Sequence, residues 1–203
     1  MSLSHAILAT LSNGCYSGYD LSKQFAGSVG FFWYATQQQI YRELSKLEEQ
    51  GYLSAELVRQ ENRPDKRVLS ITTAGKEYLR EWIMQPGTIS PIKDDLLVKL
   101  FAGHLVDRQM ILIELKHHRT QHQTTLNTYR EIERQFFADP AKCDGVNELR
   151  YLTLLNGIQV ENGWLAWCEQ AISMLENDSR REALPTRSQL RQDIILRTPF
   201  SID

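Results

Sequence analysis

A cluster of polar side chains within residues 36–51 has the chemistry that proteins use to read DNA bases. Gln38 and Arg42 lie four residues apart, so in a helix they share one face. Glutamine can bind the edge of adenine through two hydrogen bonds, and arginine can bind guanine in the same way. The polar positions around this pair are Gln37, Tyr41, Ser45, Lys46 and Glu49. The pattern favours a base-reading helix, although an ordinary surface helix also exposes glutamine and arginine.

Residues 36–51 carry the signals of a helix at both ends. Thr36 followed by Gln39 is typical of a capping box, and Gly51 stands where a helix stops. The apolar stripe that must face a core consists of Ile40, Leu44 and Leu47. This stripe lies opposite the polar face and predicts that Gln38 and Arg42 point outward.

Two earlier segments predict helices that support residues 36–51. Ser4–Leu11 has a buried stripe, and Ser17 with Asp20 predicts a capping box that opens a short helix reaching about Ala26. An aromatic cluster follows at residues 31–34, with sequence FFWY. Aromatic side chains of this size are usually core residues, and the alternative is a platform on which bases stack.

The pattern after Gly51 changes from helical to extended. Residues 53–59 and 67–72 alternate, with Leu53, Ala55 and Leu57 on one face of the first strand and Leu69 and Ile71 on one face of the second. Asn62, Pro64 and Asp65 predict the turn of a β-hairpin between them. The tip, from Arg59 to Arg67, holds four cations and two anions, and the cations considered for contact with DNA are Arg63, Lys66 and Arg67. They either solvate the turn or contact DNA phosphates, and the order helix, helix, helix, hairpin favours phosphates.

The junction between two domains is predicted at residues 86–93. Thr73 is expected to cap a helix over Ala74–Met84, and Pro86, Gly87 and Pro91 then interrupt any regular structure. Residues 1–85 are therefore predicted to form a winged helix-turn-helix DNA-binding domain.

Residues 94–176 are predicted to form a helical dimerisation domain. The expected helices are Asp94–His104, Asp107–Ala138 and about Val146–Leu175, and a helix of about 30 residues is ~45 Å long. Their apolar faces are too wide for one small three-helix domain to cover, which predicts that a second chain covers them. The expected contact residues are Ile111, Leu115, His118, His122, Tyr129, Ile132, Phe136, Leu155, Ile158, Trp164, Leu165 and Trp167. Residues 177–203 form a polar tail without an assignment.

No motif for metal binding or catalysis stands out. His118 and His122 can place two imidazoles on one metal, but neither a third ligand nor the glutamate of an HExxH motif accompanies them. They are interpreted as polar positions of a helix seam, or as groups that respond to pH near neutrality. No nucleophile elbow, phosphate loop or dinucleotide fingerprint occurs, so neither an enzyme nor a cofactor is expected.

Composition predicts a cytoplasmic protein with no membrane partner. Cys15, Cys143 and Cys168 form no CxxC pair, the first residues lack the features of a signal peptide, and no apolar run approaches about 18 residues. The formal net charge is −2, and residues 1–84 contain nine Lys+Arg and nine Asp+Glu. Since DNA-binding domains are usually basic, binding must rest on a local positive patch that dimerisation doubles.

Several segments resemble the PadR family of transcriptional regulators. They are Gly18–Leu21, the run from Gln39 to Gly51, and Ser70–Gly75. SLSHAIL, FFWYATQQQIYREL, EWIMQP, YREIERQFFADP and ELRYLTLLNG, with Trp164 and Trp167, are similar to the AphA-like branch of virulence-gene activators. The resemblance implies a homodimer that binds a partly palindromic promoter site. It places Tyr19, Gln37, Gln38, Tyr41 and Arg42 at or near double-stranded DNA, with the wing residues Arg63, Lys66 and Arg67 beside them.

A homodimeric, sequence-specific DNA-binding transcriptional regulator is therefore expected. Two alternatives remain open. Some family members sense small aromatic molecules near tryptophans, so Trp164 or Trp167 can be the wall of an effector site. The neutral charge of residues 1–84 instead suggests a winged domain that binds proteins.

Overall fold

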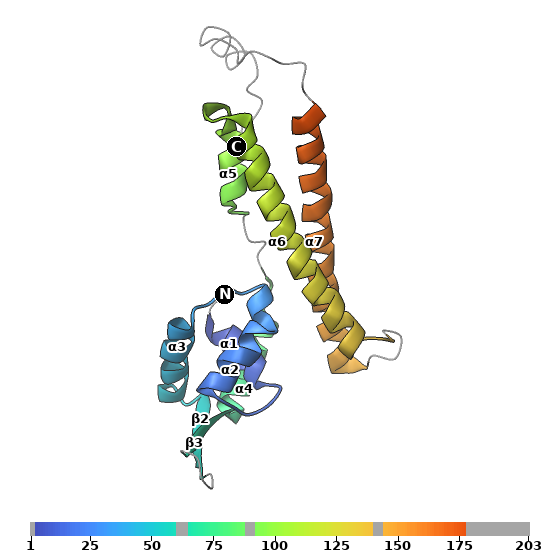
Figure 1. The fold of residues 1–203 in the computed structure, drawn as a ribbon. Coiled ribbons are helices and arrows are strands. Elements are labelled where there is room, and N and C mark those ends of the chain that lie inside the picture. The colour runs from blue at the N-terminus through green and yellow to red at the C-terminus, as the bar shows by residue number, and fades with distance from the viewer. Residues whose placement is uncertain (1–2, 60–64, 88–91, 140–143, 178–203) are drawn as a thin grey trace. The chain divides into compact units, whose positions relative to one another are not determined.

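The protein is mainly α-helical and contains a small antiparallel sheet, as the sequence predicts. The structure is a computed structural model and describes residues 3–59, 65–87, 92–139 and 144–177. The chain divides into two compact units, Met1–Ile92 and Lys93–Asp203. The first contains α1 (Leu3–Leu11), β1 (Tyr16–Ser17), α2 (Gly18–Ala26), η1 (Val29–Phe31), α3 (Gln37–Glu49), β2 (Leu53–Val58), β3 (Lys66–Ile71) and α4 (Thr73–Ile83) (Figure 1). The second contains α5 (Asp95–Phe101), η2 (Gly103–Leu105), α6 (Arg108–Phe136) and α7 (Gly145–Asn177).

The capping box predicted for α3 is present. The Thr36 hydroxyl accepts a hydrogen bond from Gln39 N at 3.2 Å, and Thr36 N donates to Gln39 Oε1 at 2.8 Å. At the other end, Gly51 has φ +76°, a left-handed conformation that favours glycine. Local chemistry at both ends therefore fixes the length of α3.

The core of the first unit lies between α1, α2, α3 and the sheet. The apolar stripe of α3 is buried as predicted, with Ile40 2%, Leu44 4% and Leu47 1% exposed. Ile7, Leu8 and Leu11 of α1 and Leu21 and Phe25 of α2 belong to the same cluster. Because this stripe faces inward, the opposite face of α3 must face outward.

The wing belongs to a three-stranded sheet with strand order β1-β3-β2, not to an isolated hairpin. In the β2–β3 ladder, Leu53 pairs with Ile71 at one end and Val58 with Lys66 at the other. Leu53 is buried, but Leu57, expected on the same apolar face, is 63% exposed. The hairpin extends beyond the core, so the alternation of β2 continues where nothing covers it (Figure 1). The predicted tip residues Asn62, Arg63 and Pro64 lie outside the described residues.

The start of α4 differs from the prediction by one residue. Thr72, not Thr73, is the N-cap, and its hydroxyl accepts a hydrogen bond from Gly75 N at 3.0 Å. The same hydroxyl donates to Gly51 O at 2.7 Å. Thr72 is the N-cap because it follows β3 in an extended conformation, whereas Thr73 is already helical. A single side chain thus joins the loop after α3 to the start of α4.

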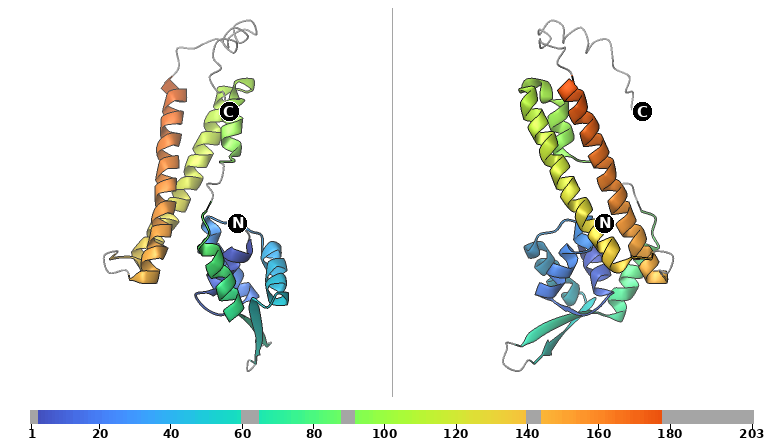
Figure 2. Two further views of the ribbon diagram at one scale, coloured as in Figure 1. Left: turned by 180° about the vertical axis from the view of Figure 1, so that it is seen from behind. Right: turned by 45° about the vertical axis from the view of Figure 1, so that its right-hand side comes forward.

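The second unit consists of two long helices and a short one. Figures 1 and 2 show α6 and α7 side by side and antiparallel, with α5 beside the start of α6. Helix α5 ends at Phe101, earlier than the predicted His104, because Gly103 begins the separate turn η2. A Cβ atom at Gly103 would lie 3.2 Å from Ile111 Cδ1, so this turn approaches α6 closely. Asp107 caps α6, and residues 88–91, 140–143 and 178–203 lie outside the described residues.

None of the described helices combines the length and apolar character that crossing a bilayer requires.

We expect Gly75→Ala to lower the free energy of unfolding of the first unit. A Cβ atom at Gly75 would lie 2.3 Å from the carbonyl oxygen of Tyr52, and backbone cannot move aside cheaply. The expected loss is about 1–3 kcal/mol, measured by urea denaturation followed by circular dichroism. Gly87→Ala is the control, because an added Cβ there meets nothing within 4 Å. Equal stabilities of the two variants would contradict the close approach of α4 to Tyr52.

Candidate nucleic-acid interface

The outward face of α3 carries the polar residues that the sequence predicted for base reading. Gln37, Gln38, Tyr41, Arg42, Ser45 and Lys46 are all exposed. The hydroxyl of Ser45 donates to Tyr41 O at 3.3 Å, and Lys46 lies 3.5 Å from the half-buried Glu43. Gln38 and Arg42 therefore lie at the centre of the exposed polar face, and Ser45 and Lys46 at its edge contact other groups of α3.

Glu43 anchors α3 to α1 and was not singled out from the sequence. Its carboxylate accepts a hydrogen bond from the Ser4 hydroxyl at 2.5 Å. Glu43 also lies one position past Arg42, so this contact holds the helix on the side next to the polar face. The rotation of α3 about its axis is thus fixed by a polar contact as well as by the apolar stripe.

Tyr41 packs where α3 meets the start of α2. A Cβ atom at Gly18 would lie 2.6 Å from Tyr41 Cε1, so a larger residue at this position would require the ring to move. Tyr41 nevertheless remains 42% exposed, and its neighbour across the junction, Tyr19, is 66% exposed. Tyr19 and Tyr41, which the family resemblance places at or near DNA, are thus both exposed beside the junction of α2 and α3.

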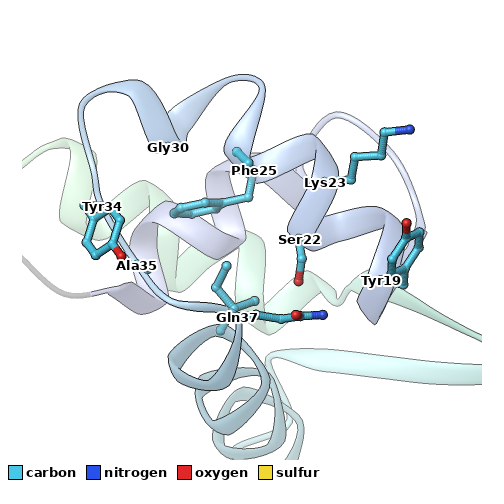
Figure 3. Close-up of a pocket in the computed structure, with 10 residues that line it drawn as sticks. Tyr19, Ser22, Lys23, Phe25, Gly30, Tyr34, Ala35 and Gln37 are labelled. Carbon is cyan, nitrogen blue, oxygen red and sulfur yellow. The ribbon is translucent and has the colours of Figure 1, made fainter. Parts of the chain in front are cut away.

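A hollow of about 380 Å³ lies between α2, the segment that follows it and the start of α3. Phe25 and Tyr34 line one end, Tyr19 stands at the other, and the Ser22 and Gln37 side chains lie between them (Figure 3). Lys23 stands at the rim and points away from Gln37 (Figure 3). The hollow thus borders the first turn of α3 with the hydroxyl of Ser22 and the amide of Gln37, while the ammonium group of Lys23 points outward.

The aromatic cluster at residues 31–34 divides between core and surface. Trp33 packs against the core, which fits the core interpretation. Phe32 is 63% and Tyr34 87% exposed, so that interpretation is wrong for these two residues. Tyr34 instead borders the hollow next to Phe25 (Figure 3).

Two cations of the wing, Lys66 and Arg67, are paired with carboxylates. Lys66 Nζ lies 2.6 Å from Asp20 Oδ2, and the Arg67 guanidinium forms an ion pair with Glu48. The Asp20 carboxylate also accepts a hydrogen bond from the Ser17 hydroxyl at 2.8 Å. Hydrogen bonds from Lys66 and Ser17 hold the pKa of the Asp20 carboxyl below its ordinary value, which keeps it ionised. Arg63, the third predicted wing cation, lies outside the described residues.

The residues predicted to mediate dimerisation mostly meet inside one protomer. Two clusters join α6 to α7, and α5 completes one of them. Leu115, Tyr129 and Ile158 are buried in these clusters, and Ile111, Ile132, Trp164, Leu165 and Trp167 pack against them. Leu155 is half-buried, and Phe136 is 71% exposed. The predicted seam therefore forms the contact between two helices of a single chain.

Of the two histidines of the seam, His122 contacts α7, and His118 contacts side chains of its own helix. His122 Nδ1 lies 2.6 Å from Glu161 Oε2, and its ring stacks on Trp164 with ring centroids 5.0 Å apart. His118 lies 3.6 Å from Glu114. Within the described residues, no group of three or more His, Cys, Asp or Glu side chains could hold a metal ion. His122 therefore helps to pack α6 against α7 through a hydrogen bond and a ring stack.

Sequence reasoning missed Ser22, Lys23, Tyr34 and the two carboxylates that pair with the wing. Lys23 carried a usable signal, since it lies four residues after Tyr19 and therefore shares its face of α2. The pairing of Glu48 with Arg67 carried no signal in the sequence, because an ion pair between residues 19 positions apart depends on the fold.

Comparisons with known proteins agree with this geometry. Residues 7–81 match the family model described as "Transcriptional regulator PadR-like family", and residues 92–176 match "Virulence activator alpha C-term". The chain is 37% identical over 186 residues to "Probable transcriptional regulator Rv1176c" of Mycobacterium tuberculosis. The match covers 87% of this chain and 98% of that relative.

Solved structures of similar proteins share the fold. The structure of the Vibrio cholerae virulence activator AphA is 34% identical with a TM-score of 0.71, covering 88% of this chain and 100% of that chain. Bacillus subtilis PadR in complex with operator DNA is 25% identical with a TM-score of 0.73, covering 85% and 98%. The same Bacillus protein in complex with p-coumaric acid gives 25% identity and a TM-score of 0.66, covering 86% and 96%.

The fold and the exposed polar face of α3 define a winged-helix transcriptional regulator. The chain belongs to the PadR-like family of transcriptional regulators, near AphA.

Proposed function

We propose that the protein is a homodimer that binds a partly palindromic promoter site, with α3 reading bases and the wing contacting the backbone. The observation that carries this proposal is the face of α3, where Gln38 and Arg42 are exposed opposite a fully buried stripe. Both side chains can make bidentate contacts to bases in a major groove. A relative with the same fold is known in complex with operator DNA.

Phosphate contacts are assigned to the surface around α3. Tyr19, Ser22 and Lys23 of α2 line the hollow next to Gln37, and Lys66 and Arg67 lie at the end of the β2–β3 ladder next to the turn of the wing. In helix-turn-helix proteins the helix before the recognition helix crosses the DNA backbone, which fits this placement of α2. Arg63 is assigned to the same role from the sequence. Contacts of this kind set register and orientation, whereas α3 sets sequence preference.

Dimerisation is assigned to apolar surface that one protomer leaves uncovered in the second unit. Because most of the predicted seam packs inside the protomer, a partner must use other residues as well. Val146, Leu149, Leu152 and Val160 are each at least 48% exposed and recur on one face of α7. Phe101, Leu105, Met110, Ile113 and Phe136 add further exposed apolar surface. A two-fold dimer that covers these faces would place two copies of α3 on one duplex, about 34 Å or a multiple apart.

We expect Arg42→Ala to weaken binding to a selected site by about 1–3 kcal/mol and to relax the preference at one base pair. Lys66→Ala is expected to weaken binding to every sequence alike and to make the salt dependence shallower by about 1, because a phosphate contact carries no sequence information. The measurements are mobility shifts on a duplex enriched by the wild-type protein from a randomised pool, and on a random duplex of equal length.

Equal losses on both duplexes for Arg42→Ala would remove the base-reading role of this residue. A wild-type protein that enriches no sequence at physiological salt would overturn specific DNA binding and leave the protein-interaction alternative.

We expect Leu152→Glu to convert the dimer to a single chain. A two-fold interface loses the side chain twice, and a buried leucine contributes roughly 1.5–3 kcal/mol, so the dimer should weaken by at least about 3 kcal/mol. Light scattering after size exclusion should give twice the mass of one chain for the wild type and a lower value for the variant. Asn147→Glu is the control, since Asn147 is exposed and lies about 140° around α7 from Leu152, off the apolar face. A wild-type protein that runs as a single chain would overturn the dimer.

An aromatic effector is a second candidate feature of the same function. Trp164 and Trp167 lie edge to face with centroids 5.3 Å apart, and both remain half-buried beside the α6–α7 clusters. A relative is known in complex with p-coumaric acid. Because His122 already stacks on Trp164, a ligand would have to use the remaining aromatic surface or displace the histidine.

We expect p-coumaric acid to quench the fluorescence of Trp164 and Trp167 in a saturable way if this region binds aromatic effectors. The experiment uses a variant with Trp33→Phe and Trp82→Phe, so that only the tryptophans of α7 report. Linear, unsaturable quenching equal to that of free tryptophan would remove the effector candidate for this compound.

A further inference from the structure

Two cations next to the turn of the wing, Lys66 and Arg67, point in opposite directions. Lys66 and Arg67 are consecutive in β3, so their side chains point to opposite faces of the sheet. Lys66 meets Asp20 of α2 on one face, and Arg67 meets Glu48 of α3 on the other. Lys66 and Arg67 are therefore each matched by a carboxylate from a different helix of the proposed DNA-facing surface.

These ion pairs contribute little to folding. The side chains remain 40% and 41% exposed in the Lys66–Asp20 pair, and 58% and 33% exposed in the Arg67–Glu48 pair. Exposed ion pairs gain little in water because the solvent screens them and both side chains lose conformational freedom. Neither carboxylate is required to fill a buried space, so their main effect is electrostatic.

The same pairs alter what the wing offers to DNA. Lys66 and Arg67 are already bound to the carboxylates of Asp20 and Glu48. A DNA phosphate must therefore share each cation with that carboxylate or displace the carboxylate. Sequence-independent affinity arises mainly from cations that replace counterions on phosphates, so each paired cation contributes less than a free one. The first unit has little positive charge to compensate, since residues 1–84 carry equal numbers of cationic and anionic side chains.

We infer that Asp20 and Glu48 are specificity-determining residues: they partly neutralise the wing cations and so lower binding to random DNA relative to the selected site. The inference rests on the proposed function. The base contacts assigned to Gln38 and Arg42 are unaffected by these carboxylates, because specificity is the difference between the two affinities. Asp20 is suited to this role, since its lowered pKa keeps it charged throughout the neutral range.

The test compares Asp20→Asn and Glu48→Gln with the control Glu49→Gln. Asparagine and glutamine preserve size and hydrogen bonding while removing charge. Glu49 is exposed, neighbours Glu48, and takes part in none of the ion pairs found among the described residues. Affinity is measured from about 50 to 200 mM salt, on a random duplex and on a duplex of equal length enriched by the wild-type protein from a randomised pool.

We expect each of the two variants to bind random duplex more tightly than the wild type and with a steeper salt dependence. One freed cation per protomer should change the slope of log K against log salt by about 1–2 in a dimer. The ratio of selected-site to random affinity should fall by about threefold or more. Glu49→Gln should change the slope less, because no cation is released.

Salt slopes of Asp20→Asn and Glu48→Gln that equal that of Glu49→Gln would overturn the inference. Weaker binding to both duplexes with a shallower slope would also overturn it, since the carboxylates would then position the cations for phosphate. Thermal denaturation checks that each variant is folded, and two independent pairs keep the test decisive if one substitution disturbs the fold. A wild-type protein that enriches no sequence overturns the proposed function itself, whereas the slopes on random duplex still test the two carboxylates.

Discussion

The burial of one stripe of α3 is the constraint on which the remaining surface depends. Ile40, Leu44 and Leu47 fit against α1 and the sheet, and a helix has only one orientation that buries all three. The Ser4–Glu43 hydrogen bond restrains the same rotation from the side. The outward direction of Gln38 and Arg42 is thus a consequence of core packing. A change of core residue that rotates α3 would redirect these side chains without touching them.

Local signals made much of this arrangement predictable from sequence. The Thr36 cap, the Gly51 terminus and the spacing of the apolar stripe define α3 and its exposed face without any distant contact. The alternation of β2 failed at Leu57 because a period of two residues does not reveal where the core ends. The strand β1 was missed because its two residues, Tyr16 and Ser17, are too few to show a pattern.

Contacts between distant segments were not predictable in the same way. The heptad rhythm of α6 correctly indicates a face that must be covered, but periodicity does not say whether the cover is α7 of the same chain or a second protomer. The pairing of Lys66 with Asp20 likewise depends on where β3 meets α2. Sequence reasoning found the cations and assigned them to phosphates, and only the fold shows that their charge is already shared.

The Thr72 hydroxyl has a consequence for how motion can pass through the first unit. It bonds the carbonyl of Gly51 directly after α3 and the amide of Gly75 in the first turn of α4, while Thr72 N donates to Tyr52 O at 3.0 Å. The first turns of α4 are therefore linked to the segment that follows α3 by these hydrogen bonds and by the stacked rings of Tyr52 and Tyr78. A tilt of α4 would act directly on the segment that follows α3. The two helices must therefore tilt together, or the hydrogen bonds of Thr72 must break.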